Sequence, residues 1–319
     1  LYATNENKKI FQIINNNTNE LFTYSNTPLD LRSVEEGLVV TTQNEVFIYD
    51  IAFNLISNIS VNEDFDTLFN VATIDKENIY IGTELFGILK SEINNSSTFQ
   101  EIHPDGPLLN TTFSVEAMSN GVWVTFGDYT NRYNPSPVRK YGISHLMNDQ
   151  WENTPFDSLF GLRNLNNISI NPFDKEHVFI NSFQDGLLEI IDNQPVMRYD
   201  QTNSGLESLI LPNSPDFISL RLSGSAFDEE GLLWTTTCLI AKPLKSFNPV
   251  TNSWKSYDFT SLIQDPINEN LGFSDLIIDK GNGLKWIGSF NYGLIGFDEN
   301  NGNPKIKSIS SEEENFPFY

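Results

Sequence analysis

The sequence predicts an all-β protein: a seven-bladed β-propeller of four-stranded antiparallel blades. One phrase recurs seven times, with an apolar run around a bulky residue, a polar turn and a second apolar run ending near Asp or Asn. The copies are 37 to 56 residues apart, and a blade of four strands takes about 40–50 residues. Asn, Ser and Thr are abundant and long helical periodicity is absent from the sequence, which favours many short strands joined by turns.

Each expected blade is anchored by the bulky residue of its first run, which we place in the second strand. Neighbouring blades pack face to face, so one large side chain per blade is needed to fill the wedge between them. The anchors are Tyr2, Val39, Tyr80, Trp123, Phe179, Trp234 and Trp286. We expect residues 1–319 to form a single β-propeller.

The fifth and seventh blades show all four strands in the sequence. In the fifth blade these are Ile168–Ile170, Val178–Ile180, Leu187–Ile190 and Val196–Tyr199. In the seventh they are Ser274–Asp279, Lys285–Ser289, Leu294–Phe297 and Lys305–Ile309. Glycine precedes the third strand at Gly87, Gly186 and Gly293, where positive φ permits a tight turn.

The first blade is expected to be incomplete. Its pattern starts at the second strand with Leu1–Thr4, and the chain stops abruptly after Phe316–Tyr319. We therefore expect an excerpt of a larger multidomain protein, with the inner strand of this blade supplied from elsewhere.

The net charge of the chain makes some classes of binding partner unfavourable. The formal net charge is -23, which repels nucleic acid and anionic membranes. No apolar run approaches the roughly 20 residues of a transmembrane helix. The single cysteine, Cys238, excludes an intramolecular disulfide and is expected to be a buried small hydrophobe.

Catalytic and metal-binding patterns are missing from the sequence. His103, His145 and His177 lack metal-ligand spacing, and no G-x-S-x-G nucleophile elbow occurs. Asp228 before Trp234, and Asp279 before Trp286, resemble the structural turns of sialidase propellers. The run 298–303 resembles a calcium loop without its closing acid, and a hairpin turn is preferred. We expect no enzyme activity and no cofactor, and leave open a divalent cation such as calcium.

Topology indicates where a ligand would bind. In a four-stranded blade, the turn between the second and third strands lies on the same face as the connection to the next blade. Aromatic rings beside amide and carboxyl groups, as needed to bind carbohydrate, occur in these turns at Phe86, Asp128, Tyr129, Phe183, Gln184, Asp185, Phe290, Asn291 and Tyr292. The alternative is that these rings only pack against neighbouring blades.

Several longer segments resemble the PorZ family. They are Phe179–Glu189, Asn203–Leu209, Gly224–Asp228, Phe126–Thr130 with Tyr133–Pro135, and Tyr141–Ser144. The resemblance runs from roughly Leu38 to Glu314. The Trp286-Ile287-Gly288 unit is also similar to the propeller repeats of two-component regulators, so it discriminates little.

The resemblance implies a function without implying site residues. PorZ-like proteins are two-propeller, non-enzymatic surface components of the type IX secretion system of Bacteroidota. They are exported, associate with the outer membrane, and act with sortase-like and outer-membrane barrel components of the attachment complex. They present anionic lipopolysaccharide or another glycan to the sortase-like partner. The chain would be one propeller of such a protein, with its signal peptide outside the excerpt.

The net charge conflicts with binding an anionic glycan. Binding would need a local basic spot, such as Arg132, Arg139 and Lys140 or Lys242 and Lys245, a bridging cation, or contacts to neutral sugars. Two other functions stay open. One is the extracellular oligosaccharide-sensing propeller of a hybrid two-component regulator, and the other, less favoured, is a glycan-cleaving enzyme.

Overall fold

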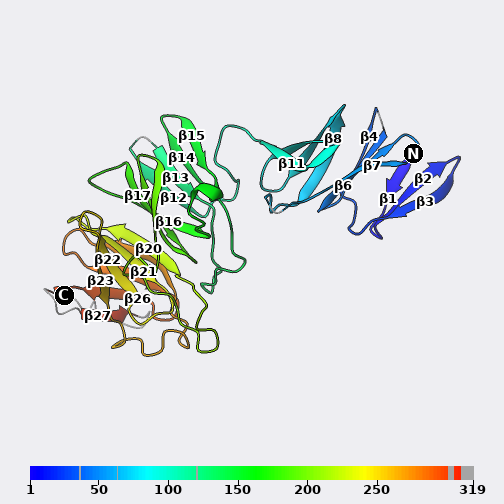
Figure 1. Ribbon diagram of the computed structural model, residues 1–319. Helices are drawn as coiled ribbons and strands as arrows, with labels where there is room; N and C mark the ends of the chain where they lie inside the picture. Colours follow the sequence, from blue (N-terminus) through cyan, green and yellow to red (C-terminus); the bar gives the residue numbers. More distant parts are fainter. Residues whose placement is uncertain (36, 63, 120, 301–304, 310–319) are drawn as a thin grey trace. The chain divides into compact units, whose positions relative to one another are not determined.

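The computed structural model describes residues 1–35, 37–62, 64–119, 121–300 and 305–309. Apart from one 3-10 turn, η1 (Phe156–Ser158), every element in this part of the chain is a β-strand. The strands form seven antiparallel sheets, and each strand pairs only with its neighbours in sequence. This confirms the predicted all-β class and the seven antiparallel sheets. The chain divides into two compact units, Leu1–Asn110 and Thr111–Tyr319, which are described separately (Figure 1).

The first unit contains three sheets. The first sheet has three described strands, β1 (Tyr2–Thr4), β2 (Lys9–Ile14) and β3 (Asn17–Thr23). The second sheet has β4 (Asp30–Val34), β5 (Gly37–Thr41), β6 (Glu45–Asp50) and β7 (Leu55–Ser60). The third sheet has β8 (Phe69–Asp75), β9 (Asn78–Thr83), β10 (Ile88–Glu92) and β11 (Asn95–Ile102).

The second unit contains four sheets of four strands. The fourth sheet has β12 (Ser114–Met118), β13 (Gly121–Thr125), β14 (Ile143–Met147) and β15 (Gln150–Thr154). The fifth sheet has β16 (Leu165–Ile170), β17 (His177–Ser182), β18 (Gly186–Ile191) and β19 (Gln194–Tyr199). The sixth sheet has β20 (Leu222–Phe227), β21 (Leu233–Thr237), β22 (Leu244–Asn248) and β23 (Ser253–Tyr257). The seventh sheet has β24 (Phe273–Ile278), β25 (Lys285–Ser289), β26 (Leu294–Asp298) and β27 (Lys305–Ile309).

The anchor residues occupy equivalent places. All except Tyr2 lie in the second strand of a four-stranded sheet, and Tyr2 lies in the first of the three described strands of its sheet. The glycines before the third strands have positive φ, 63° at Gly87, 113° at Gly186 and 63° at Gly293. A Cβ at Gly186 would lie 2.1 Å from the Tyr199 carbonyl oxygen, so a larger residue is excluded there. Residues 301–303 of the calcium-like run and the chain end at 316–319 lie outside the described residues.

The hydrophobic cores lie between neighbouring sheets. Trp234 of the sixth sheet is fully buried, stacks on Tyr257 at 5.2 Å and contacts Phe297 of the seventh sheet at 6.0 Å. Phe179 of the fifth sheet is equally buried and meets Phe227 and Phe247 of the sixth, each at 5.9 Å. Four anchors, Val39, Trp123, Phe179 and Trp234, are buried between sheets as predicted. The prediction is wrong for Tyr2, Tyr80 and Trp286, which are only half-buried; in the third and seventh sheets the neighbouring Ile79, Ile81 and Ile287 face the cores. In the second unit the first strands β12, β16, β20 and β24 also lie against one another in order.

Candidate functional site on the long-loop face

One end of the second unit carries its long connections. Strand pairing places the start of each third strand beside the end of the fourth strand, for example Leu187 of β18 beside Tyr199 of β19. The second-to-third-strand turns and the connections between sheets therefore share one face, as expected. We name it the long-loop face; it comprises residues 126–142, 155–164, 183–185, 200–221, 238–243, 258–272 and 290–293.

An aromatic cluster lies on this face. Tyr129 stacks on Phe183 with ring centroids 4.2 Å apart and on Tyr133 at 5.4 Å. Tyr133 in turn contacts Phe290 of the seventh sheet edge-on at 5.9 Å. The structure thus brings together three turns that the sequence predicted to face one ligand, with Tyr133 as the link that the prediction did not include.

The loop 126–142 is held by two residues from other sheets. Asn164 donates from Nδ2 to the carbonyl oxygens of Asp128 at 2.6 Å and Pro135 at 2.8 Å, and its Oδ1 accepts from the Arg139 backbone N–H at 2.5 Å. Arg221 donates from Nη1 to the Tyr133 carbonyl oxygen at 3.1 Å. The loop therefore crosses from the fourth sheet to contacts with the fifth, sixth and seventh.

Three of the predicted ligand residues are buried. Phe183 is fully buried, and Gln184 and Asp185 are each 6% exposed. Gln184 donates to the Ile218 carbonyl oxygen and accepts from the Ser219 hydroxyl, while Asp185 pairs with Arg163. These side chains stabilise the face from within and present no free surface to a ligand. These three residues therefore fit the alternative that the turn residues pack inside the protein and do not contact a ligand.

The turn between β25 and β26 stays accessible. Phe290 is 46% exposed. Asn291 is exposed and donates from Nδ2 to the Glu269 carbonyl oxygen at 2.6 Å, and Tyr292 is half-buried against the core. Asp128 is also half-buried, with its carboxylate 4.0 Å from the Arg139 Nε atom.

Phe86 is the predicted ligand residue of the first unit. Its ring is half-buried and packs edge-on against Phe65 with centroids 5.2 Å apart. The turn is fixed by the Thr83 hydroxyl, which accepts from the Phe86 backbone N–H at 3.0 Å. Its ring contributes to the core between the second and third sheets.

Arginine is concentrated on the long-loop face, although this face carries nine carboxylates against six basic side chains. It carries or borders five of the six arginines of the chain, Arg132, Arg139, Arg163, Arg198 and Arg221. Arg132, Lys140 and Lys242 are exposed and form no ion pair with any residue that the structure describes.

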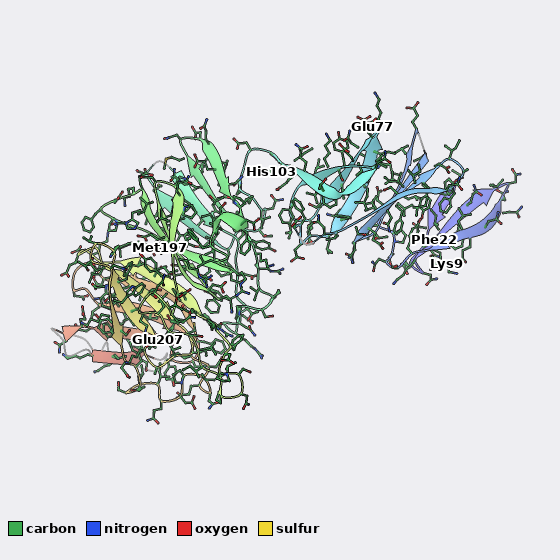
Figure 2. The ribbon with its side chains drawn as sticks, in the orientation of Figure 1. Lys9, Phe22, Glu77, His103, Met197 and Glu207 are labelled. Atoms are coloured by element: carbon green, nitrogen blue, oxygen red, sulfur yellow. The ribbon has the colours of Figure 1, made fainter. Side chains whose placement is uncertain are left out.

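The predicted basic pair of Lys242 and Lys245 requires a correction. The Lys245 side chain is fully buried between strands, with Nζ 3.0 Å from Glu207 and 3.0 Å from the Ser256 hydroxyl. Glu207 lies on the second unit (Figure 2). Burial lowers the pKa of Lys245, while the Glu207 carboxylate opposes that shift. Of the two, only Lys242 is exposed, and it contributes to lowering the pKa of Asp258.

The described part of the chain contains no group of three or more His, Cys, Asp and Glu side chains able to hold a metal ion. Cys238 is fully buried directly after β21, and burial raises the pKa of its thiol to about 11. Within the same described ranges, no helix is long and apolar enough to cross a membrane.

The sequence did not identify the residues that shape this face. Asn164 has a φ of 47° and is 1% exposed. Its only signal in the sequence is an asparagine directly before a strand, a residue type that tolerates the left-handed conformation. Arg221 stands directly before a strand, with no feature that reveals its partner 88 residues earlier.

The architecture can be compared with solved structures. No family model and no curated protein sequence matches the chain. The fold is similar to that of PorZ. Superposition on PorZ of Porphyromonas gingivalis, an essential surface component of the type IX secretion system, gives a TM-score of 0.65 at 16% identity. It covers 97% of this chain and 42% of PorZ, which is itself a β-propeller protein. The chain therefore spans less than half the length of PorZ.

Two further solved structures are more distant. An inactive virginiamycin B lyase from Staphylococcus aureus has a TM-score of 0.43 at 11% identity, covering 98% of this chain and 88% of the lyase. A chain of a mitotic checkpoint complex has a TM-score of 0.44 at 10% identity, covering 87% of this chain and 77% of that chain.

Proposed function

We propose that this chain is a non-enzymatic binding propeller of the type IX secretion machinery. In this proposal it lies at the cell surface, associated with the outer membrane, and presents anionic lipopolysaccharide to a sortase-like partner beside outer-membrane barrel components. The similarity to PorZ over 97% of the chain supports the first part. The observation that carries the second is the gathering of arginines on the long-loop face of a protein with a net charge of -23.

The long-loop face has the groups that an anionic glycan needs. Guanidinium groups bind phosphate and carboxylate through paired N–H donors, and Arg132, Lys140 and Lys242 form no ion pair among the described residues. The exposed Phe290 ring beside Tyr133 adds an apolar surface on which a sugar ring can stack. These three cations supply local attraction on a face whose carboxylates, like those of the rest of the chain, repel an anion.

A matched pair of triple variants tests the proposal. Replacing Arg132, Lys140 and Lys242 by Ala should weaken binding to purified anionic lipopolysaccharide about tenfold, and the affinity of the unmodified protein should fall with salt. The control replaces Lys175, Lys280 and Lys305 by Ala, because these exposed lysines lie at the opposite strand ends and remove the same charge. Equal affinities of the two variants would refute the assignment of the anion to this face. Loss of binding by the unmodified protein when EDTA is added would refute it as well, because a bridging cation would then hold the anion.

The secretion role has its own test. Deleting the gene should leave cargo proteins of the type IX pathway unattached to the surface, and the full-length protein should co-purify with the sortase-like component from outer membranes. Normal cargo attachment in the deletion strain would contradict the proposal, whatever the glycan affinity.

A further inference from the structure

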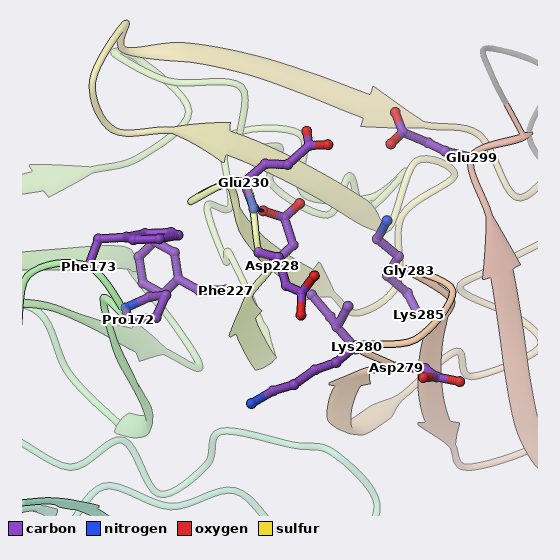
Figure 3. Close-up of a pocket in the computed structure, with 12 residues that line it drawn as sticks. Pro172, Phe173, Phe227, Asp228, Glu230, Asp279, Lys280, Gly283, Lys285 and Glu299 are labelled. Atoms are coloured by element: carbon purple, nitrogen blue, oxygen red, sulfur yellow. Dashed lines mark hydrogen bonds between the residues drawn. The ribbon is translucent and has the colours of Figure 1, made fainter.

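A pocket of about 510 Å³ opens at the other strand ends of the second unit (Figure 3). Its walls come from the first-to-second-strand turns of the fifth, sixth and seventh sheets, around Phe173, Asp228 and Gly283. Volumes of this size are typical of small-molecule sites. None of the ligand residues predicted from the sequence lies here.

A buried ammonium group projects into this pocket. Lys285 of β25 is 5% exposed, and its Nζ atom lies 3.9 Å from the centroid of the Trp234 ring in the sixth sheet. Among the described residues it has no hydrogen-bond acceptor. Figure 3 shows the amine directed into the space between Asp228 and Glu299. An ammonium carries three donors. The Lys285 Nζ atom reaches the pocket and interacts electrostatically with Glu299 and Asp228, so its donors can be directed to an acceptor supplied by a ligand.

The carboxylates around the amine are partly occupied. Asp228 accepts from Trp234 Nε1 at 2.7 Å and from the Leu232 backbone N–H at 2.8 Å. Glu299 accepts from Lys255 at 2.7 Å and from the Tyr257 hydroxyl at 2.6 Å, both through Oε1. These bonds fix the two carboxylates in place. The second oxygen of Glu299 and the exposed carboxylate of Glu230 stay able to accept further bonds.

The charge pattern disfavours an anionic ligand, and a polar uncharged ligand matches both signs of charge in the lining. The acids that line the pocket, among them Asp228, Glu230 and Glu299, repel an anion. A cationic group next to the Lys285 ammonium is repelled in turn. A hydroxyl group satisfies both sides, because its oxygen accepts from the ammonium while its O–H donates to a carboxylate.

The opposite wall is apolar. Phe173, in the turn before β17, is 70% exposed, and its ring lies against Gly231, within 3.4 Å of where a Cβ atom would sit. Phe227 stands beside it in Figure 3. A sugar ring has an apolar face that stacks on such a ring and hydroxyls at its edge.

We propose that this pocket binds a neutral saccharide, with one sugar ring stacked on Phe173 and a hydroxyl held between Lys285 Nζ and the carboxylates. The site is separate from the long-loop face and takes an uncharged ligand, so it goes beyond the proposed function and does not rest on it.

The experiment uses the intact chain with methyl glucoside, methyl galactoside and methyl mannoside, observed by saturation-transfer NMR and titration calorimetry. At least one of these should bind, and Lys285→Met and Phe173→Ala should each weaken it about tenfold. Lys285→Met keeps the packing over Trp234, and its melting temperature should equal or exceed that of the unmodified protein, because the desolvation of the ammonium group is removed. Phe290→Ala, on the long-loop face, should bind the sugar normally.

Three results would overturn this assignment: no binding of any of the three glycosides, equal binding in both pocket variants, or tighter binding of glucosamine or glucuronate than of the neutral sugars. The lipopolysaccharide affinity of the two pocket variants distinguishes the sites. That affinity should stay unchanged. A failure of the saccharide proposal therefore leaves the long-loop proposal intact, and a failure of the long-loop proposal leaves the saccharide proposal intact.

Discussion

Arg163 holds the Asp185 carboxylate through two side-chain hydrogen bonds, Nε to Oδ2 at 2.9 Å and Nη2 to Oδ1 at 2.6 Å. The Arg163 backbone N–H adds a third bond to Oδ2 at 2.8 Å. Asp185 is 8% exposed at its side chain and Arg163 is 36% exposed. The pair ties the connection 155–164 to the turn between β17 and β18.

Replacing Asp185 by Ala should lower the free energy of unfolding of the second unit by about 2 kcal/mol, because charged hydrogen bonds to a nearly buried carboxylate are lost. The melting temperature should fall by about 4–8 °C. Asp216→Ala removes an exposed carboxylate on the same face and should change it by less than about 2 °C. Equal effects of the two substitutions would show that the pair contributes nothing.

His145 should make stability depend on pH. It is 2% exposed and stacks on Trp123 at 4.1 Å, and neither ring nitrogen has a partner among the described residues. Burial lowers its pKa below the usual 6.5, while Glu152 opposes the shift. The unfolded chain therefore binds the proton more readily, and this contribution to stability is lost as the pH falls through about 6.5 towards the folded pKa.

His145→Phe keeps the stacked ring and removes the titration. The variant should be more stable by about 1 kcal/mol at neutral pH, and it should lose less stability than the unmodified protein between pH 7.5 and pH 5. Urea unfolding followed by tryptophan fluorescence measures both quantities. His103→Gln, at an exposed histidine of the first unit (Figure 2), is the control and should keep the original pH slope; parallel slopes for all three proteins would contradict the assignment.

Truncation of Phe183 should lower the free energy of unfolding much more than truncation of Phe290. Phe183→Ala should cost about 3–5 kcal/mol, because the fully buried ring leaves a cavity under Tyr129. Phe290→Ala should cost less than about 1 kcal/mol, because its ring is 46% exposed. Thermal unfolding of both variants checks this, and a larger loss for Phe290→Ala would mean that the face is packed differently.

Asn164→Ala should release the loop 126–142. Three side-chain hydrogen bonds to that loop are lost, at a cost of about 2 kcal/mol. Trypsin should then cut after Arg132, Arg139 or Lys140 about tenfold faster, since cleavage follows the population of the open loop. Asn131→Ala, exposed in the same loop, should leave the rate unchanged. A rate for Asn164→Ala equal to that of the unmodified protein would show that other contacts hold the loop.

Periodicity was sufficient to predict the sheets. Val39, Trp123 and Trp234 stand in second strands because each core lies between two sheets and needs one large side chain there. The predicted bounds of β25 and β27 agree with the structure at both ends. That the seven sheets form a single propeller stays a prediction.

The candidate site was predictable only in part. Tyr129 and Phe183 could be placed on one face from topology, but the burial of Phe183 depends on a loop that returns over it from the fourth sheet. Lys245 and Lys285 alternate with apolar residues as exposed residues do, yet a neighbouring connection covers one and a neighbouring sheet the other. Burial by segments that are distant in the chain produces no periodic pattern in the sequence.

The loop 126–142 makes assembly of the second unit directional. Tyr133 is synthesised long before its partners: Arg221 follows 88 residues later, and Gly272 and Phe290, both in contact with its ring, follow later still. Contacts this distant in sequence form slowly and late. A ribosome-bound fragment that ends before Gly272 lacks both of these later contacts, so one side of the Tyr133 ring stays uncovered until the seventh sheet is made, which gives a chaperone a defined interval in which to bind it.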